Sequence, residues 1–230
     1  MTIGGLQKLT LIDYPGKIAC TVFLTGCNFL CPWCYSSELV LKEKIRKQPK
    51  ILEKEFFNFL KKRKGLLEGV VICGGEPTIN KQLPSFIKKI KNLGYSVKLD
   101  TNGSNSIMLK KLLDDNLIDY VAMDVKAPLG LKFQIPNSKF QNKVRKSVEL
   151  LKKSGIDFEF RTTVVPTIHK KEDIFKIAKW ISGAPKYYLQ NFRSEKTLDP
   201  EFEKIKPYSQ EYLLEIQKAI SPFFEICQLR

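Results

Sequence analysis

Short apolar runs alternate with helix-like patterns along the whole 230-residue chain, and this alternation constrains the fold more than any other feature. Six of the runs have the length of strands: residues 18–24, 69–73, 96–100, 120–125, 157–164 and 187–190. Strict alternation of strands and helices is typical of a parallel sheet covered by helices. A complete eightfold barrel usually needs about 250 residues. We therefore predict one α/β domain over residues 1–230, a partial (β/α)6 barrel with parallel strands inside and helices outside.

Apolar residues at a period near 3.6 predict the helices between these strands. The stripes are Leu52, Phe56, Phe59 and Leu60; Leu83, Phe86, Ile87, Ile90 and Leu93; Ile174, Ile177, Ala178 and Ile181; and Leu213, Ile216 and Ile220. Gly94, Gly155 and Gly183 follow periodic segments, where a left-handed residue commonly ends a helix. Ser209 is a suitable N-cap for the last helix.

A doubly wound sheet is the main alternative to the barrel. Its dinucleotide-binding form carries a G-x-G-x-x-G loop after the first strand, and this chain has no such loop there. Residues 73–77 do not form a phosphate loop either, because no Gly-Lys-Ser/Thr ending follows the glycines. These absences favour the partial barrel.

The chain carries 39 Lys and Arg against 24 Asp and Glu, a formal net charge of +15. Such a charge could serve a nucleic acid, an anionic cofactor or an acidic protein partner. The lysines lie in helical stretches without interleaved aromatic residues, a pattern that favours solvated helix faces and makes nucleic acid an unexpected partner. No apolar run reaches 18 residues, and residues 1–5 do not begin a secretion signal. We therefore expect a cytoplasmic protein with no membrane contact.

Polar side chains gather at the predicted carboxyl ends of the strands, where parallel α/β folds place their chemistry. They belong to Glu76, Asp100, Thr101, Asp124, Lys126, Arg161 and Gln190, and two glycines, Gly74 and Gly75, directly precede Glu76. Charged groups inside a fold are costly unless they bind each other or a ligand. The pattern predicts either a polar ligand that carries both charges or an internal network of salt bridges.

Three of the six cysteines, Cys27, Cys31 and Cys34, form a C-x3-C-x2-C motif directly after the first predicted strand. Structural zinc usually takes four ligands, and no fourth cysteine or histidine follows at finger-like spacing. Three thiolates in one loop suit a [4Fe–4S] cluster in which one iron has no protein ligand. The alternative is a zinc site completed by Cys73 or Cys227. Because Cys227 lies near the C-terminus, we expect it to be exposed.

Together these motifs resemble those of the radical S-adenosylmethionine (SAM) enzymes. The resemblance rests on the cysteine motif, with an aromatic residue before its third cysteine, and on Gly74-Gly75-Glu76-Pro77. Residues 4–8, 11–17, 23–28 and 99–103 resemble, more specifically, the activating proteins of anaerobic ribonucleoside-triphosphate reductases. The resemblance extends over essentially the whole chain.

The resemblance implies reductive cleavage of SAM at a [4Fe–4S] cluster to a 5′-deoxyadenosyl radical. That radical would abstract the Cα hydrogen of a glycine on a partner enzyme, which we expect to be the anaerobic ribonucleotide reductase. A flavodoxin- or ferredoxin-like protein would donate the electron. Residues 36–50 contain no cysteine, so we expect one cluster only. Two alternatives remain: a radical SAM enzyme that acts on a small molecule or RNA, and a basic nucleic-acid-binding module with a structural metal.

The resemblance also implies roles for individual residues. Cys27, Cys31 and Cys34 would hold the cluster. Contacts to SAM would come from Trp33, Tyr35, Gly74, Gly75, Glu76, Asp124, Lys126, Arg161 and Gln190. Glu76 would accept from the SAM amine, Lys126 would bind the carboxylate, and Trp33 would lie near the adenine. Asp100, Thr101 and Asp124 resemble a monovalent cation site.

Two positions depart from the pattern of many activating proteins. Tyr35-Ser36 follows the third cysteine, where His-Asn is common, and Gln190 lies where some relatives have a histidine. Neither departure removes a cluster ligand.

Overall fold

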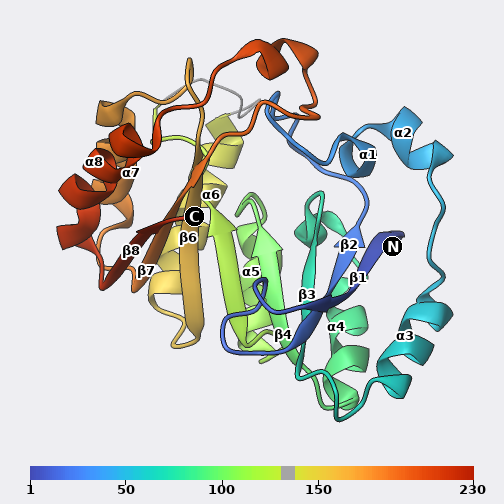
Figure 1. Cartoon of the computed structure of the whole chain (residues 1–230). Coiled ribbons are helices and arrows are strands. Elements are labelled where there is room, and N and C mark those ends of the chain that lie inside the picture. Colours follow the sequence, from blue (N-terminus) through green and yellow to red (C-terminus); the bar gives the residue numbers. More distant parts are fainter. Residues whose placement is uncertain (131–137) are drawn as a thin grey trace. The chain divides into compact units, whose positions relative to one another are not determined.

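The computed structural model describes residues 1–130 and 138–230 and divides them into two compact units. The first unit contains residues 1–28, 36–101 and 107–121, and the second contains residues 29–35, 102–106 and 122–230. Figure 1 shows the α/β character of both units. Whether they form the single domain predicted from the sequence stays a prediction.

The first unit is a mixed sheet with helices. Its elements are β1 (Ile3–Thr10), β2 (Ala19–Leu24), α1 (Ser37–Val40), α2 (Lys42–Lys47), α3 (Glu53–Lys62), β3 (Gly69–Gly74), the 3-10 helix η1 (Pro77–Ile79), α4 (Leu83–Asn92), β4 (Ser96–Thr101) and α5 (Ser106–Asp114). β1 pairs with β2 antiparallel, whereas β2, β3 and β4 are parallel neighbours. β5 (Tyr120–Asp124) follows β4 in the strand order and runs from the first unit into the second.

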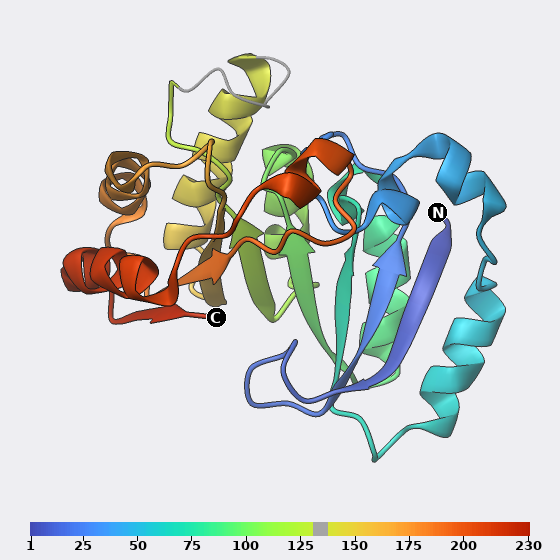
Figure 2. The same cartoon turned by 45° about the horizontal axis from the view of Figure 1, so that its top comes forward.

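The second unit continues the same pattern. Its elements are the end of β5, α6 (Ser138–Lys152), β6 (Asp157–Val164), α7 (Lys171–Ile181), β7 (Lys186–Asn191), η2 (Pro200–Lys204), α8 (Gln210–Ile220), η3 (Ser221–Phe223) and β8 (Ile226–Leu229). β6, β7 and β8 are parallel neighbours. In Figure 2 the red helix α8 lies beside the dark red strand β8.

The predicted α/β class is confirmed, and the six predicted strands correspond to β2 through β7. β1 and β8 were not predicted. β1 contains two glycines and three consecutive exposed residues, so it lacks the pattern of a buried strand. β8 has only four residues. Cys227 lies in β8 and is 9% exposed, so the expectation that it is exposed was wrong: α8 and β7 enclose it.

Most residues of the predicted apolar stripes lie on the buried faces of their helices, but Leu52 does not: it precedes α3 as its N-cap and is 64% exposed. Phe56 of α3 stacks on Phe86 of α4 with ring centroids 5.4 Å apart, and the exposed fraction of each residue is at most 2%. Leu213, Ile216 and Ile220 of α8 are fully buried. Gly94, Gly155 and Gly183 all have positive φ, as helix-ending residues require. No helix in the described ranges combines the length and the apolar character needed to cross a bilayer.

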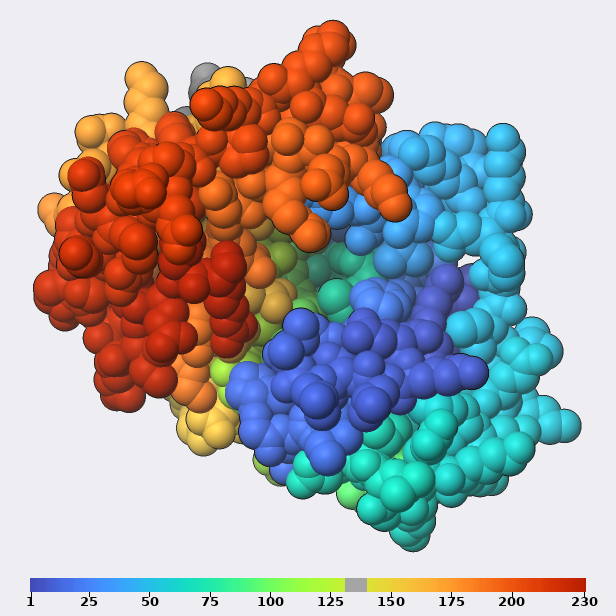
Figure 3. Space-filling model, in the orientation of Figure 1, coloured from blue at the N-terminus to red at the C-terminus, as the bar shows by residue number. Residues whose placement is uncertain are grey.

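The loop before β2 closes one end of the first unit. Tyr14 is 3% exposed and forms a cluster with Ala19, Val71 and Tyr120. The neighbouring Leu11 and Ile12 are 70% and 83% exposed, and this blue N-terminal region lies at the surface in Figure 3. Residues 11–17, which supported the resemblance to the activating proteins, therefore anchor the sheet through Tyr14.

Removal of the predicted N-cap tests how this helix is stabilised. The Ser209 Oγ atom accepts from the Tyr212 backbone N–H at 3.2 Å. Ser209→Ala leaves this N–H without its partner, and we expect it to lower the free energy of unfolding by about 1 kcal/mol in urea titrations. Ser85→Ala is the control, because the Ser85 hydroxyl lies on an exposed helical turn and caps no backbone N–H. Equal effects of both substitutions would contradict the capping role.

Candidate functional site

The cysteine motif lies in the loop after β2. Cys27 belongs to the first unit, and Cys31 and Cys34 belong to the second. The Cys34 backbone N–H donates to the Cys31 carbonyl at 2.9 Å, which fixes a turn between these two residues. None of the three cysteines is in a disulfide, and Cys31 is buried.

The side chains of the three motif cysteines can be tested against the needs of a metal centre. Within the described residues, no three His, Cys, Asp or Glu side chains already converge as a metal site. The donor set nevertheless fits an iron–sulfur cluster, because three cysteines that form no disulfide lie within eight residues and thiolates are the usual cluster ligands.

The surroundings of Cys31 affect its charge. Burial raises the pKa of its thiol, and the Lys126 ammonium acts in the opposite direction. A nearby cation favours the thiolate, which is the form that binds metal. Lys126 is therefore an electrostatic partner of the cysteine loop within the second unit.

Asp124, Lys126 and Arg161 form a charged cluster at the carboxyl ends of β5 and β6. The Asp124 carboxylate accepts from Lys126 Nζ at 3.1 Å and from Arg161 Nε at 3.0 Å. Burial alone would raise the pKa of Asp124, but the two cations outweigh it and hold the value at about 2. The pKa of Lys126 is raised, because Asp124 and the cysteines outweigh the effect of burial. The alternative of an internal salt-bridge network is therefore present, and these side chains are still 15–30% exposed.

His169 positions the Lys126 backbone, a role that the sequence did not indicate. Its ring is 1% exposed, its Nδ1 accepts from the Val165 N–H at 3.0 Å, and its Nε2 lies 2.9 Å from the Lys126 carbonyl. These partners define the tautomer: Nε2 carries the ring proton and donates a hydrogen bond to the Lys126 carbonyl oxygen. Burial lowers the pKa of His169, so the ring is neutral in the folded chain.

Trp33 and Tyr35, the two aromatic residues predicted to contact SAM, lie in the second unit. Trp33 is 4% exposed and packs its ring against His169 and Phe202, with centroids 6.3 and 6.5 Å away. The Tyr35 hydroxyl accepts from the Arg193 N–H at 2.7 Å, and burial raises the pKa of Tyr35. These contacts fix the part of the loop that contains Cys34, while a role of either ring toward SAM stays a prediction.

Gly74 and Gly75 bring the end of β3 against the end of β2. The Gly75 N–H donates to the Leu24 carbonyl at 2.9 Å, and the Glu76 N–H donates to the Gly26 carbonyl at 2.8 Å. A Cβ at Gly75 would lie 2.1 Å from the Gly26 oxygen, and one at Gly74 would lie 2.2 Å from the Leu24 oxygen. The structural reason for both glycines is therefore this backbone approach, which holds the motif next to Cys27.

Glu76 is completely buried and caps η1. Its Oε1 atom accepts from the Thr78 N–H at 3.0 Å, from the Thr78 hydroxyl and from the Thr101 hydroxyl at 2.7 Å. The carboxylate is thus fixed by β4 as well as by its own helix. Its predicted contact with the SAM amine stays a prediction.

Asp100 and Thr101, which were predicted to share a cation site, interact with different groups. Thr101 donates to Glu76, whereas Asp100 accepts from the Lys98 ammonium at 2.5 Å. Asp124 belongs to the second unit and has the partners described above. Lys98 is a buried charge that the sequence reading did not single out.

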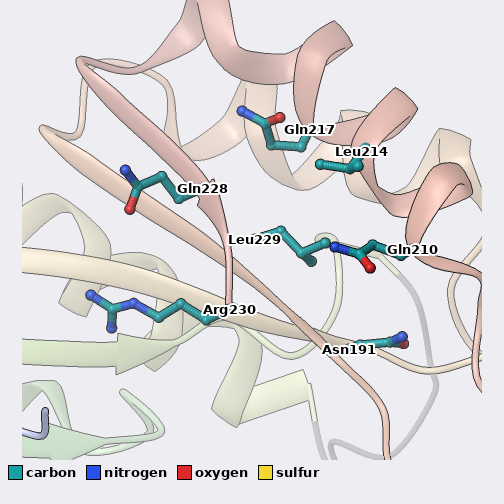
Figure 4. A pocket seen from close by; sticks show the side chains of 7 residues that line it. All are labelled: Asn191, Gln210, Leu214, Gln217, Gln228, Leu229 and Arg230. Carbon is teal, nitrogen blue, oxygen red and sulfur yellow. The ribbon is translucent and has the colours of Figure 1, made fainter.

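The last predicted residue, Gln190, pairs in register with Thr163 between β7 and β6. At the end of β8, which the sequence did not predict, the Arg230 guanidinium lies 3.2 Å from buried Glu159 and 3.4 Å from the Tyr188 ring centroid. Figure 4 shows Arg230 beside a cavity of about 530 Å³. That cavity is lined by Asn191, Gln210, Leu214, Gln217, Gln228, Leu229 and Arg230, and includes none of the predicted site residues.

Comparison with known proteins identifies the class of this chain. Residues 21–181 match the model of the Radical SAM superfamily, and the chain belongs to that family. Two Methanocaldococcus jannaschii proteins, both provisionally named glycyl-radical enzyme activating enzymes, are similar. One is 33% identical and aligns over 99% of this chain and 95% of its own length; the other is 30% identical and aligns over 94% and 86%.

A solved structure supports the fold assignment. Streptococcus suis SuiB superposes with a TM-score of 0.67 and 14% sequence identity over 90% of this chain and 48% of SuiB. The resemblance to radical SAM enzymes is thus confirmed: the chain is a radical SAM enzyme, which uses a [4Fe–4S] cluster and SAM. The alternative of a non-enzymatic nucleic-acid-binding module is thereby excluded.

The contact between Gly75 and Gly26 predicts a steric effect that is specific to this position. Gly75→Ala places a methyl group against backbone atoms that cannot rotate away, and we expect it to cost about 1–3 kcal/mol of unfolding free energy in urea. Gly5→Ala is the control, because a Cβ there would meet only the Phe23 side chain, no closer than 3.4 Å. A Gly75→Ala chain as stable as the control would contradict the close approach.

His169 predicts a pH dependence of stability. Its folded pKa is lowered, so the unfolded chain binds the proton more readily, and stability is lost as pH falls below the unfolded value of about 6.5. His169 is the only histidine, which makes the interval from pH 7.5 to 5.5 selective for it. Unfolding titrations across this interval should show the decline in the native chain and a flatter profile in His169→Gln. Parallel profiles would show that the ring is not held neutral.

Proposed function

We propose that this radical SAM enzyme activates a glycyl-radical enzyme, and that its partner is the anaerobic ribonucleoside-triphosphate reductase. The observation that carries the activating role is the similarity over nearly the full length of both chains to a protein provisionally named for that activity. The choice of the reductase as partner rests on the resemblance of residues 4–8 and 11–17 to the reductase-activating proteins.

Cys27, Cys31 and Cys34 would hold the cluster, and the iron without a protein ligand would bind SAM. When bound, the cluster and SAM would supply hydrogen-atom abstraction: one electron from the external donor would cleave SAM to methionine and a 5′-deoxyadenosyl radical, and this radical would take the Cα hydrogen of a partner glycine. Hydrogen-atom transfer of this kind needs no general base on the protein. The neutral, fully hydrogen-bonded state of His169 agrees with a structural role.

The charges near Cys31 would prepare the loop for metal. Lys126 favours the thiolate of Cys31, while Asp124 holds the ammonium of Lys126 and is itself fixed by Arg161. The same three side chains remain partly exposed, so they would also offer both signs of charge to the methionyl group of SAM. In this proposal Lys126 binds the SAM carboxylate, and Arg161 and Gln190 contact the methionyl or ribose groups.

Gly74, Gly75 and Glu76 would bind the amine end of SAM. The hydrogen bonds from Thr78 and Thr101 hold the Glu76 carboxylate in one orientation before any ligand arrives. Trp33 would lie near the adenine, with Tyr35 fixing the segment after it. A flavodoxin- or ferredoxin-like donor would supply the electron in the cytoplasm, and part of the +15 net charge would meet an acidic protein partner.

The test is anaerobic incubation of the reconstituted enzyme with SAM, a reductant and the purified reductase. We expect the electron-paramagnetic-resonance doublet of a glycyl radical and one equivalent of 5′-deoxyadenosine for each radical formed. Cys31→Ala should abolish both, because the cluster loses one of its three thiolates. Cys227→Ala is the matched control, since this buried cysteine lies in β8, outside the motif.

The outcomes separate the proposed function from its sibling. Deoxyadenosine that forms without a glycyl radical on the reductase would favour a radical SAM enzyme that acts on a small molecule or RNA. Full activity in Cys31→Ala would overturn the ligand assignment itself.

A further inference from the structure

Lys98 is a cation buried inside the first unit. Its side chain is 2% exposed, and its ammonium donates to the Asp100 carboxylate at 2.5 Å. The same ammonium lies 5.9 Å from the centroid of the Tyr120 ring, a distance at which the face of an aromatic ring attracts a cation. A buried lysine is rare unless it is paired, and Lys98 pairs with the Asp100 carboxylate and faces the Tyr120 ring.

The geometry of β4 explains this arrangement. Side chains two residues apart share a face of a strand, so Lys98 and Asp100 project together. Val97 and Leu99 project to the opposite face and are fully buried. Thr101 also lies on that opposite face, where its hydroxyl donates to Glu76. The side chains of Asp100 and Thr101, predicted to bind one cation together, therefore diverge.

A free monovalent cation does not fit these residues. Hard cations bind through oxygen atoms, and a carboxylate is the strongest such ligand. The Asp100 carboxylate already neutralises an ammonium, and a second positive ion beside Lys98 would be repelled where little water is present to screen it. The site expected from the resemblance is therefore already neutralised from within the chain.

We propose that the Lys98 ammonium replaces the free monovalent cation at Asp100, so that this enzyme has a covalently tethered counter-ion and needs no alkali metal ion there. Lys98 acts as a positioning residue: it holds Asp100 at the carboxyl end of β4 at any salt composition. The inference rests on the proposed function only for the expectation that a cation belongs at this position; the Lys98–Asp100 pair itself does not depend on it.

The experiment compares thermal unfolding in potassium chloride with that in choline chloride at equal ionic strength, using the full chain without a partner. Choline is too large for a site of this kind, so a difference between the salts reports potassium binding. We expect equal midpoints in both salts for the native chain. In Lys98→Met, an unbranched side chain of similar length removes the Lys98 ammonium from the Asp100 carboxylate. The midpoint should then rise with potassium concentration, as it does for a ligand that binds only the folded state.

Lys91→Met is the matched control. Lys91 also pairs with an aspartate, Asp119, at 2.6 Å, but its side chain is 30% exposed. Removal of this pair should leave the midpoints in the two salts equal, which separates the loss of a lysine–aspartate pair from the loss of a buried counter-ion. Thallium-205 resonance gives a second readout: broadening of the free thallous ion signal is expected with Lys98→Met and not with the native or Lys91→Met chains.

Two results would overturn the proposal. One is a native chain that potassium stabilises over choline, because a free cation then binds despite Lys98. The other is a folded Lys98→Met chain with equal midpoints in both salts and no thallium broadening. If Lys98→Met does not fold, Lys98→Gln replaces it, and the titration of the native chain decides by itself. None of these readouts involves the reductase, so a failed glycyl-radical assay leaves this result unaffected.

Discussion

The contact between the ends of β2 and β3 is the constraint on which the first half of the site depends. Two backbone hydrogen bonds connect Gly75 and Glu76 to Leu24 and Gly26, and this connection requires a position without a Cβ. Cys27 follows directly after it, and Glu76 turns into its capping position directly beyond it. This close approach between two main-chain segments therefore sets the positions of Cys27 and of the buried Glu76 carboxylate.

In the second unit, charge rather than main-chain packing organises the site. Asp124 lies between two cations, which lower its pKa and favour the ionised carboxylate. The Lys126 ammonium also acts on the Cys31 thiol, whose pKa it lowers, and His169 holds the Lys126 main chain through a hydrogen bond to its carbonyl oxygen. His169 had no role predicted from the sequence, and its support of the charged cluster is recognised from the hydrogen-bond partners of its two ring nitrogens.

Much of the fold could be predicted from the sequence because burial imposes a period. The helices α3, α4, α7 and α8 and the six strands β2 to β7 were all predicted, because each contains enough buried apolar residues to form a stripe or a short run, even where β4 and β6 also carry charged residues. β1 and β8 lie at the ends of the strand order, where one side needs no apolar partner, so their composition gave no signal. The cysteine motif and the glycines could be identified by spacing. The link from Thr101 to Glu76 and the burial of Lys98 against Tyr120 could not, because each depends on which other element packs against a given face of β4.

Tyr14 has a structural role within a segment, residues 11–17, that also contributes to the resemblance to the activating proteins. Residues 11–17 pointed toward one group of enzymes, yet Tyr14 lies among Ala19, Val71 and Tyr120, and a Cβ at Gly69 would meet its ring at 2.8 Å. The Tyr14 ring packs against the Tyr120 ring. The Tyr120 ring is also the one that faces the Lys98 ammonium. Residues 11–17 thus contribute to the packing of the first unit as well as to the resemblance.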